Sequence, residues 1–159
     1  MPDWEKIIAR QHAAAHSNDE YELVTGDRAA ASEIARRGDQ LGLIFPEEFV
    51  SLYETYNGVG IGSGDDVWWV LHPLDQLSQF GKSVCSFFDE THPEEADLFY
   101  PFLDFGNGDA IGYLSDESGN VMPGLYVFSH ESVRFDEDQE SEEFLSLIPV
   151  SIEDFFDSI

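Results

Sequence analysis

Basic residues are scarce in this chain of 159 residues, where seven lysines and arginines stand against 33 aspartates and glutamates. The formal net charge is −26, and residues 40–159 carry −23 of it because Lys82 and Arg134 are their only basic residues. Such a charge repels nucleic acids and anionic membranes, and it attracts basic partners over a Debye length of roughly 10 Å. Solubility, a solvated surface without a partner, or adaptation to high salt would give the same composition.

Cysteine is represented by Cys85 alone, which excludes an internal disulfide and a metal site built from several cysteines. Its apolar setting, KSVCSFF, predicts a buried and unreactive thiol. A catalytic cysteine needs a thiolate with a base nearby, and the strong negative charge of this chain raises the pKa of a thiol.

Long apolar runs are also missing, since no stretch approaches the ~20 residues of a membrane span. The first residues, MPDWEKIIARQHAAAH, lack the basic start and apolar run of a signal peptide. We therefore expect a cytoplasmic protein.

Aromatic residues are plentiful, at 14% of the chain, and hydrophobic residues make up 42%. A disordered acidic chain would be poor in aromatics, so this composition predicts a folded protein. The length fits one domain, because single domains commonly run to about 100–200 residues.

Local patterns place helices toward both ends of the chain and strands in its middle. Helices are expected over residues 4–15, 26–42, 46–56 and 151–159, and strands over 67–71, 98–105, 110–115 and 124–131, with a short helix after Pro73. Residues 58–66 and 87–97 are expected to be loops. Helices and strands are segregated along the chain, which predicts an α+β fold: an antiparallel sheet in the middle of the chain, packed by N-terminal and C-terminal helices.

The segment LGLIFPEEFVSLYETYNG, residues 41–58, resembles the signature of the SUKH superfamily of Smi/Knr-type proteins. LHPLDQL, FLDFGNGDAIGYL, LYVFSHE and SIEDFF then follow in the family order. The resemblance covers roughly residues 27–159, with Phe45 where leucine is commoner. It implies a single SUKH-like domain over residues 1–159, in which residues 1–26 form an N-terminal helical extension without a counterpart in the family.

For bacterial members, the resemblance implies an immunity protein that binds and neutralises a polymorphic toxin, often a nuclease. Because nucleases are commonly basic, the acidic composition predicts a basic toxin domain as partner. Fungal relatives act in cell-wall and stress regulation, so an intracellular regulatory scaffold is the alternative. Genes beside this one would separate the two functions.

Candidate catalytic residues do not form a recognisable motif. His12 and His16 lie four positions apart on a predicted helix, but HAAAH lacks the glutamate of hydrolytic zinc helices. Ser63 sits between a predicted helix and a strand, the reverse of the order around a nucleophile elbow. The glycines of residues 58–64 match no phosphate-binding loop, and no basic residue is near them. We expect no enzyme, no cofactor and no metal site.

The stretch LDFGNGDAIGYL, residues 103–114, could be a calcium loop or a hairpin turn. Asp104, Asn107 and Asp109 are oxygen donors, but they miss the alternate positions of an EF-hand calcium loop. The flanks are typical of strands. We therefore predict a hairpin in which the glycines and Asn107 supply positive φ and Asp109 bonds the turn backbone.

Protein interfaces usually depend on aromatic anchors within a polar rim. If residues 67–71 form a strand, one of Trp68 and Trp69 must point outward. Phe87 and Phe88 adjoin a second acidic run, although all four aromatic residues could instead belong to the core. The predicted partner-binding residues are Asp65, Asp66, Trp68, Trp69, Phe87, Phe88, Asp89, Glu90, Glu94 and Glu95.

Overall fold

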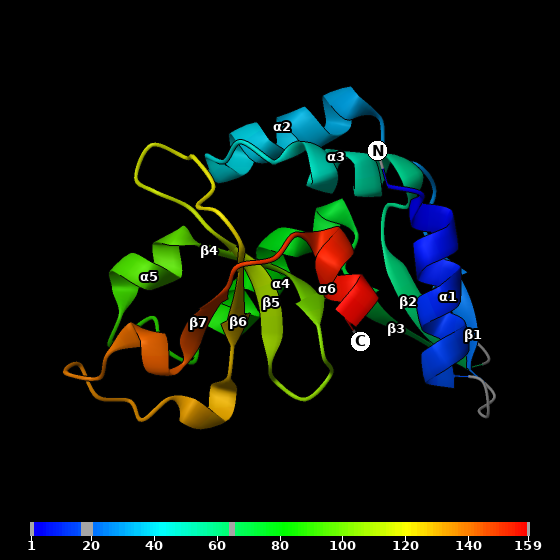
Figure 1. Ribbon diagram of the computed structural model, residues 1–159. Coiled ribbons are helices and arrows are strands. Elements are labelled where there is room, and N and C mark those ends of the chain that lie inside the picture. Colours follow the sequence, from blue (N-terminus) through cyan, green and yellow to red (C-terminus); the bar gives the residue numbers. More distant parts are fainter. Residues whose placement is uncertain (1, 17–20, 64–65, 159) are drawn as a thin grey trace.

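The structure is a computed structural model that describes residues 2–16, 21–63 and 66–158. In these residues one antiparallel sheet of seven strands follows the order of the chain (Figure 1). The strands are β1 (Glu22–Thr25), β2 (Val59–Ser63), β3 (Asp66–Leu71), β4 (Phe99–Asp104), β5 (Ala110–Leu114), β6 (Leu125–Phe128) and β7 (Leu145–Ile148). The predicted α+β class is confirmed.

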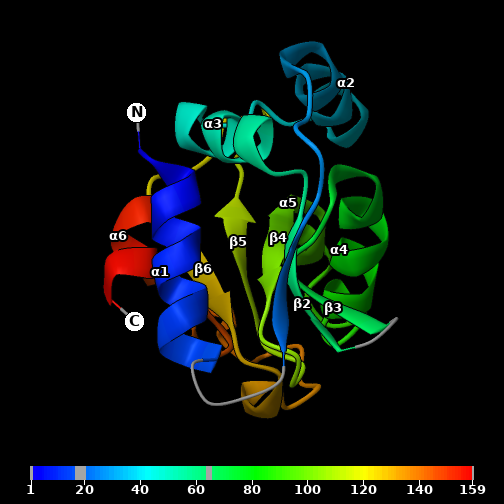
Figure 2. The same ribbon diagram turned by 90° about the vertical axis from the view of Figure 1, so that its right-hand side faces the viewer.

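Helices cover both faces of this sheet. They are α1 (Trp4–His16), α2 (Ala31–Leu41), α3 (Glu47–Thr55), α4 (Leu77–Cys85), α5 (Pro93–Leu98) and α6 (Ile152–Ser158). Figure 2 shows α1 and α6 on one side of the sheet and α4 on the other, with α3 across one end. Among the described residues, no helix is long and apolar enough to cross a membrane.

Helix α3 shows how local sequence sets the core. Pro46 caps the helix in an extended conformation, and acidic residues occupy the first turn, where they meet the positive end of the helix dipole. Phe49, Leu52 and Tyr53 are buried on one face of α3 and pack with α1, α6 and the sheet. Gly58, with φ of 106°, lets the chain turn away after the helix.

Two segments predicted as loops are regular structure. Residues 59–63 form β2, whose glycines have weak strand propensity, yet they pair on both sides with β1 and β3. Residues 93–98 form α5, with Pro93 in the first turn. Strands β1 and β7 also lie outside the predicted strand region. β1, β2 and β7 are strands because they pair with neighbouring strands, and not because of their local propensity.

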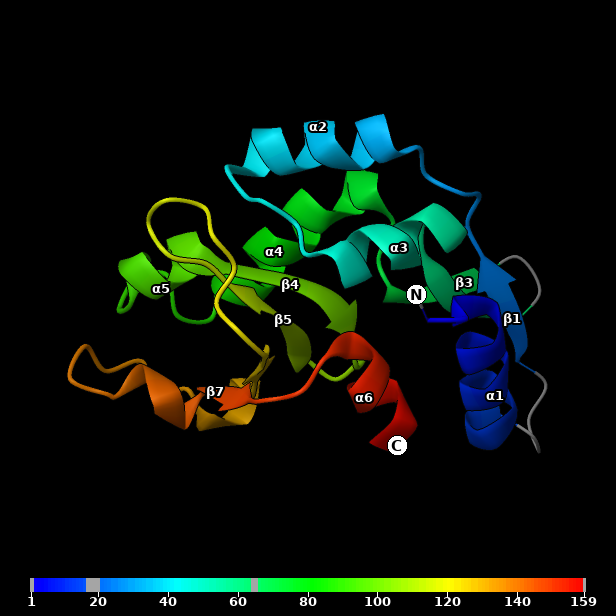
Figure 3. The same cartoon turned by 45° about the horizontal axis from the view of Figure 1, so that its top comes forward.

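Residues 1–26 contain the strand β1 as well as the predicted helix. β1 pairs with β2, and Trp4, Ile7 and Ile8 of α1 belong to the main core. Helix α2 begins at Ala31, later than expected, and Asp27 does not cap it because the helix has Ala30 at its N-cap. In Figure 3, α1 lies beside β1 at one end of the sheet.

Candidate functional site

Strand β3 carries one predicted group of partner-binding residues to the surface. The side chains of Val67, Trp68 and Val70 are 40%, 50% and 38% exposed. β2 pairs with β3 along its length, but β4 meets β3 only where Leu71 lies opposite Leu103. In the described part of the chain, residues 66–70 therefore have a strand on one side only.

The two tryptophans of β3 lie on opposite faces of the strand. Trp68 is half exposed, and its ring makes an edge-to-face contact with Tyr21 at 5.4 Å. Trp69 is partly buried over β2, where a Cβ at Gly58 or Gly60 would come within 3.1 or 3.2 Å of its ring. The prediction of one outward tryptophan is confirmed, and the glycines make room for the other.

The second predicted group differs from the expectation at Phe88. Its side chain is 1% exposed, and its ring packs 5.0 Å from that of Phe144, so the prediction of Phe88 as a surface anchor is wrong. Phe87 is partly buried beside His130. Asp66, Asp89, Glu90 and Glu94 are exposed and Glu95 is partly buried, while Asp65 lies outside the described residues.

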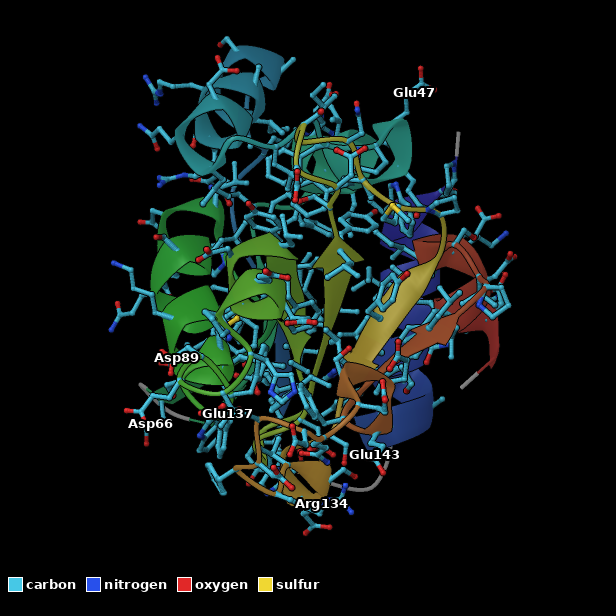
Figure 4. All side chains as sticks on the ribbon, turned by 90° about the vertical axis from the view of Figure 1, so that its left-hand side faces the viewer. Glu47, Asp66, Asp89, Arg134, Glu137 and Glu143 are labelled. Atoms are coloured by element: carbon cyan, nitrogen blue, oxygen red, sulfur yellow. The ribbon has the colours of Figure 1, made fainter. Side chains whose placement is uncertain are left out.

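The structure does not bring these two groups together. β3 lies toward one end of the molecule and α5 at the other (Figures 1 and 3). Viewed from the α5 side, Asp89 is labelled toward one edge of the molecule and Glu137 nearer its middle (Figure 4). The acidic residues therefore form a distributed negative surface, and the exposed side chains of Trp68 and Val70, on one face of β3, form a separate apolar patch.

A cleft of about 480 Å³ lies between α4 and the ends of the central strands. His72, Asp104 and Asp109 line it, and each aspartate pairs with a histidine. His72 Nε2 lies 3.0 Å from Asp104 Oδ2, and His130 Nδ1 lies 2.6 Å from Asp109 Oδ1. His72 follows β3, Asp104 ends β4, Asp109 precedes β5 and His130 follows β6, so four strands contribute one residue each.

The β4–β5 loop positions both aspartates. Asp104 Oδ1 accepts the N–H of Gly106 at 2.7 Å, and Asn107 Oδ1 accepts the N–H of Asp109 at 3.0 Å. Asp109 Oδ1 accepts the backbone N–H of His130 at 2.9 Å. The predicted hairpin is confirmed, but the side chain of Asp109 bonds His130, two residues past the end of β6, and not its own turn.

Glycines alone supply the positive φ of this loop. Gly106 and Gly108 have φ of 80° and 102°, whereas Asn107 has none, contrary to the prediction. A Cβ at Gly108 would also lie 2.8 Å from Nδ1 of His130. Gly108 therefore keeps space for the imidazole that pairs with Asp109.

Aromatic rings from α4 and the turn after it form the opposite wall of the cleft. The ring of Phe80 stacks on His72, with centroids 4.0 Å apart and an interplanar angle of 19°. Phe87 lies 5.7 Å from His130. Both phenylalanines are partly exposed, so the cleft has apolar faces beside its two carboxylates.

The cleft lacks a prepared nucleophile within the described residues. Ser83 lines it, but no hydrogen bond joins its hydroxyl to either imidazole. The described residues also contain no group of three histidine, cysteine or acidic side chains placed to hold a metal. The side chains of Ser63 and His16 lie outside the described structure.

Cys85, the last residue of α4, is buried, as its sequence setting predicted. Burial, with smaller effects from the charges of Asp89 and Asp97, raises the pKa of the Cys85 thiol to about 12. The thiol is therefore protonated at neutral pH and unsuited to nucleophilic chemistry.

Sequence reasoning missed the two pairs because their members are 32 and 21 positions apart. With 33 acidic residues in the chain, a histidine near an acid carries no signal by itself. The one usable signal was the presence of an aspartate at each end of the glycine-rich loop, in a stretch that reads as a hairpin.

Comparison with known proteins gives a family assignment. The sequence model of the SMI1/KNR4 family (SUKH-1) matches residues 28–158, which covers all seven strands except β1. No curated protein matches the chain.

Proposed function

Because this chain belongs to the SMI1/KNR4 family (SUKH-1), we propose that it is an immunity protein that binds and neutralises a basic toxin domain. The observation that carries the proposal is the net charge of −26, concentrated as −23 in residues 40–159. A nuclease toxin needs a basic surface to bind its polyanionic substrate. A protein of this charge is steered to that surface and blocks it without catalysing a reaction.

The surface offers both features that such binding needs. Exposed acids, among them Asp66, Asp89 and Glu94, provide long-range attraction. The apolar patch of Trp68 and Val70 provides contact area that can be desolvated in a complex. In this proposal charge sets the rate of encounter, and aromatic contacts set the lifetime of the complex.

Co-expression tests the proposal directly. The toxin domain encoded beside this gene is expressed in a sensitive host with or without the protein, and survival and co-purification are measured. We expect survival only when the protein is present, together with a stable complex. Failure to neutralise any neighbouring toxin would refute the immunity function and favour the regulatory scaffold.

Association kinetics test the role of charge. The association rate of the purified pair, followed by stopped-flow fluorescence, should fall steeply between low and physiological salt, because exposed charges are screened. The dissociation rate should change much less. An association rate independent of salt would show that the negative charge does not steer binding. The charge would then serve solubility or adaptation to high salt.

A further inference from the structure

We propose that the cleft between α4 and the β4–β5 loop binds the guanidinium group of an arginine side chain. The proposed function identifies the donor of that arginine as the basic toxin domain, and the inference rests on it to that extent.

Hydrogen-bonding capacity is the first reason. A carboxylate only accepts, so His72 Nε2 and His130 Nδ1 carry the protons that face Asp104 and Asp109. The buried Nδ1 of His72 has no partner in the described structure, and in a neutral imidazole with its proton on Nε2 this atom is an acceptor. Asp109 accepts both of its hydrogen bonds through Oδ1, which leaves Oδ2 open. The unmet groups are acceptors, and arginine supplies only donors.

Shape and charge are the second reason. The guanidinium group is planar and cationic and stacks on aromatic faces, as the rings of Phe80 and Phe87 allow. The carboxylates of Asp104 and Asp109 line the cleft, and no lysine or arginine is among the residues lining it. Its volume of about 480 Å³ accommodates a side chain together with the backbone that presents it.

A lysine fits this cleft less well. Its ammonium group is compact and strongly hydrated. It has no planar face to stack on phenylalanine, and it cannot present two parallel N–H donors to two acceptors as a guanidinium group does. A metal ion fits less well too, because the described residues offer no group of three ligating side chains here. The cleft is therefore matched to a flat cation with several donors.

The test is a titration of the isotope-labelled protein with Nα-acetyl-arginine N-methylamide, followed by NMR of the histidine rings and loop amides. We expect saturable shifts at His72, His130 and residues 104–109. The lysine analogue should bind more weakly, and the uncharged citrulline analogue should not bind. Shifts that never saturate and spread over the acidic surface would overturn the proposal.

Matched variants separate the cleft from general charge. Asp104→Asn and Asp109→Asn each remove one charge but keep an oxygen that accepts the structural N–H bonds. Each should weaken arginine binding roughly tenfold, because a charge-assisted hydrogen bond is lost. Glu54→Gln removes the same charge from the exposed face of α3 and should leave binding unchanged. Equal effects in all three variants would refute a specific site.

Phe80→Leu tests the stacking wall while keeping an apolar side chain. It should reduce the preference for the arginine probe over the lysine probe, and an unchanged preference would exclude stacking.

The immunity function and the arginine site can be refuted independently of each other. If the probe saturates the cleft but no toxin is neutralised, the arginine site is supported and the immunity function is refuted. If a toxin is neutralised but the probe does not bind, only the arginine site is refuted.

Discussion

At the residue scale, Asp104 and Asp109 combine a structural and a site role. Asp104 accepts a loop N–H through one oxygen and faces His72 with the other. Asp109 ties the loop to the segment after β6 by accepting from both the backbone and the ring of His130. The loop conformation and the cleft therefore depend on the same carboxylates.

Glu48 is a second carboxylate whose role is visible only in the structure. It accepts the N–H of Ile152, at 3.1 and 3.0 Å from its two oxygens, where α6 begins, and the hydroxyl of Tyr113 at 3.3 Å. Burial, and then the charge of Glu48, raise the pKa of Tyr113, so its hydroxyl stays protonated and donates. Glu48 thus joins α3, α6 and β5.

Glu48→Ala should lower the free energy of unfolding by about 1–3 kcal/mol, because two buried donors lose their acceptor. Urea denaturation measures the change. Glu47→Ala is the matched control: its exposed side chain makes no hydrogen bond in the described structure, so its effect should stay within about 0.5 kcal/mol. Equal losses in the two variants would contradict this role of Glu48.

At the element scale, α1 supports the sheet although it lies outside the family match. Trp4 is 2% exposed, its indole N–H donates to Ser51 Oγ at 2.7 Å, and its ring meets Phe156 edge to face. α1 therefore connects α3 and α6. The fold of residues 28–158 depends on this helix for part of its core.

Trp4→Ala should destabilise the protein by about 3–5 kcal/mol, as expected when a large buried aromatic residue leaves a cavity. Lys6→Ala, on the exposed face of α1, should change stability by less than about 0.5 kcal/mol. Chemical denaturation followed by circular dichroism compares the two. A small effect of Trp4→Ala would show that α1 is dispensable for the core.

At the scale of the whole molecule, negative charge is largely uncompensated. The described pairs of arginine with acidic residues are exposed, as for Arg10–Asp157 and Arg134–Glu143, and such pairs contribute only about 0–1 kcal/mol each. The remaining carboxylates repel one another across the surface. This repulsion opposes folding and also creates the field that steers a basic partner.

Added salt should therefore stabilise the protein. Between about 10 mM and 0.5 M NaCl we expect a gain near 1 kcal/mol from screening, which corresponds to a rise in Tm of about 2–4 °C for a domain of this size. The rise should level off once the Debye length falls to a few Å. Calorimetry measures Tm at each salt concentration. A constant or falling Tm would contradict the inference that charge repulsion destabilises the folded protein.

How far the sequence predicts this protein depends on the range of each signal. Pro46 at the start of α3, the glycines of the β4–β5 loop and the strand pattern of β3 act within a few residues. The predicted helix, hairpin and outward tryptophan are confirmed, although Pro46 is the N-cap and Asn107 has no positive φ. β2 escaped prediction because its glycines weaken the local signal, and strand pairing on both sides stabilises it.

The α+β class, the hairpin and the negative field follow from the amino-acid sequence, because composition, periodicity and turn chemistry do not depend on how distant segments pack. The burial of Phe88, the placement of the two predicted partner groups at opposite ends and the two histidine–aspartate pairs come from the tertiary structure. Strand order and register set those distances, and they arise from packing the whole chain.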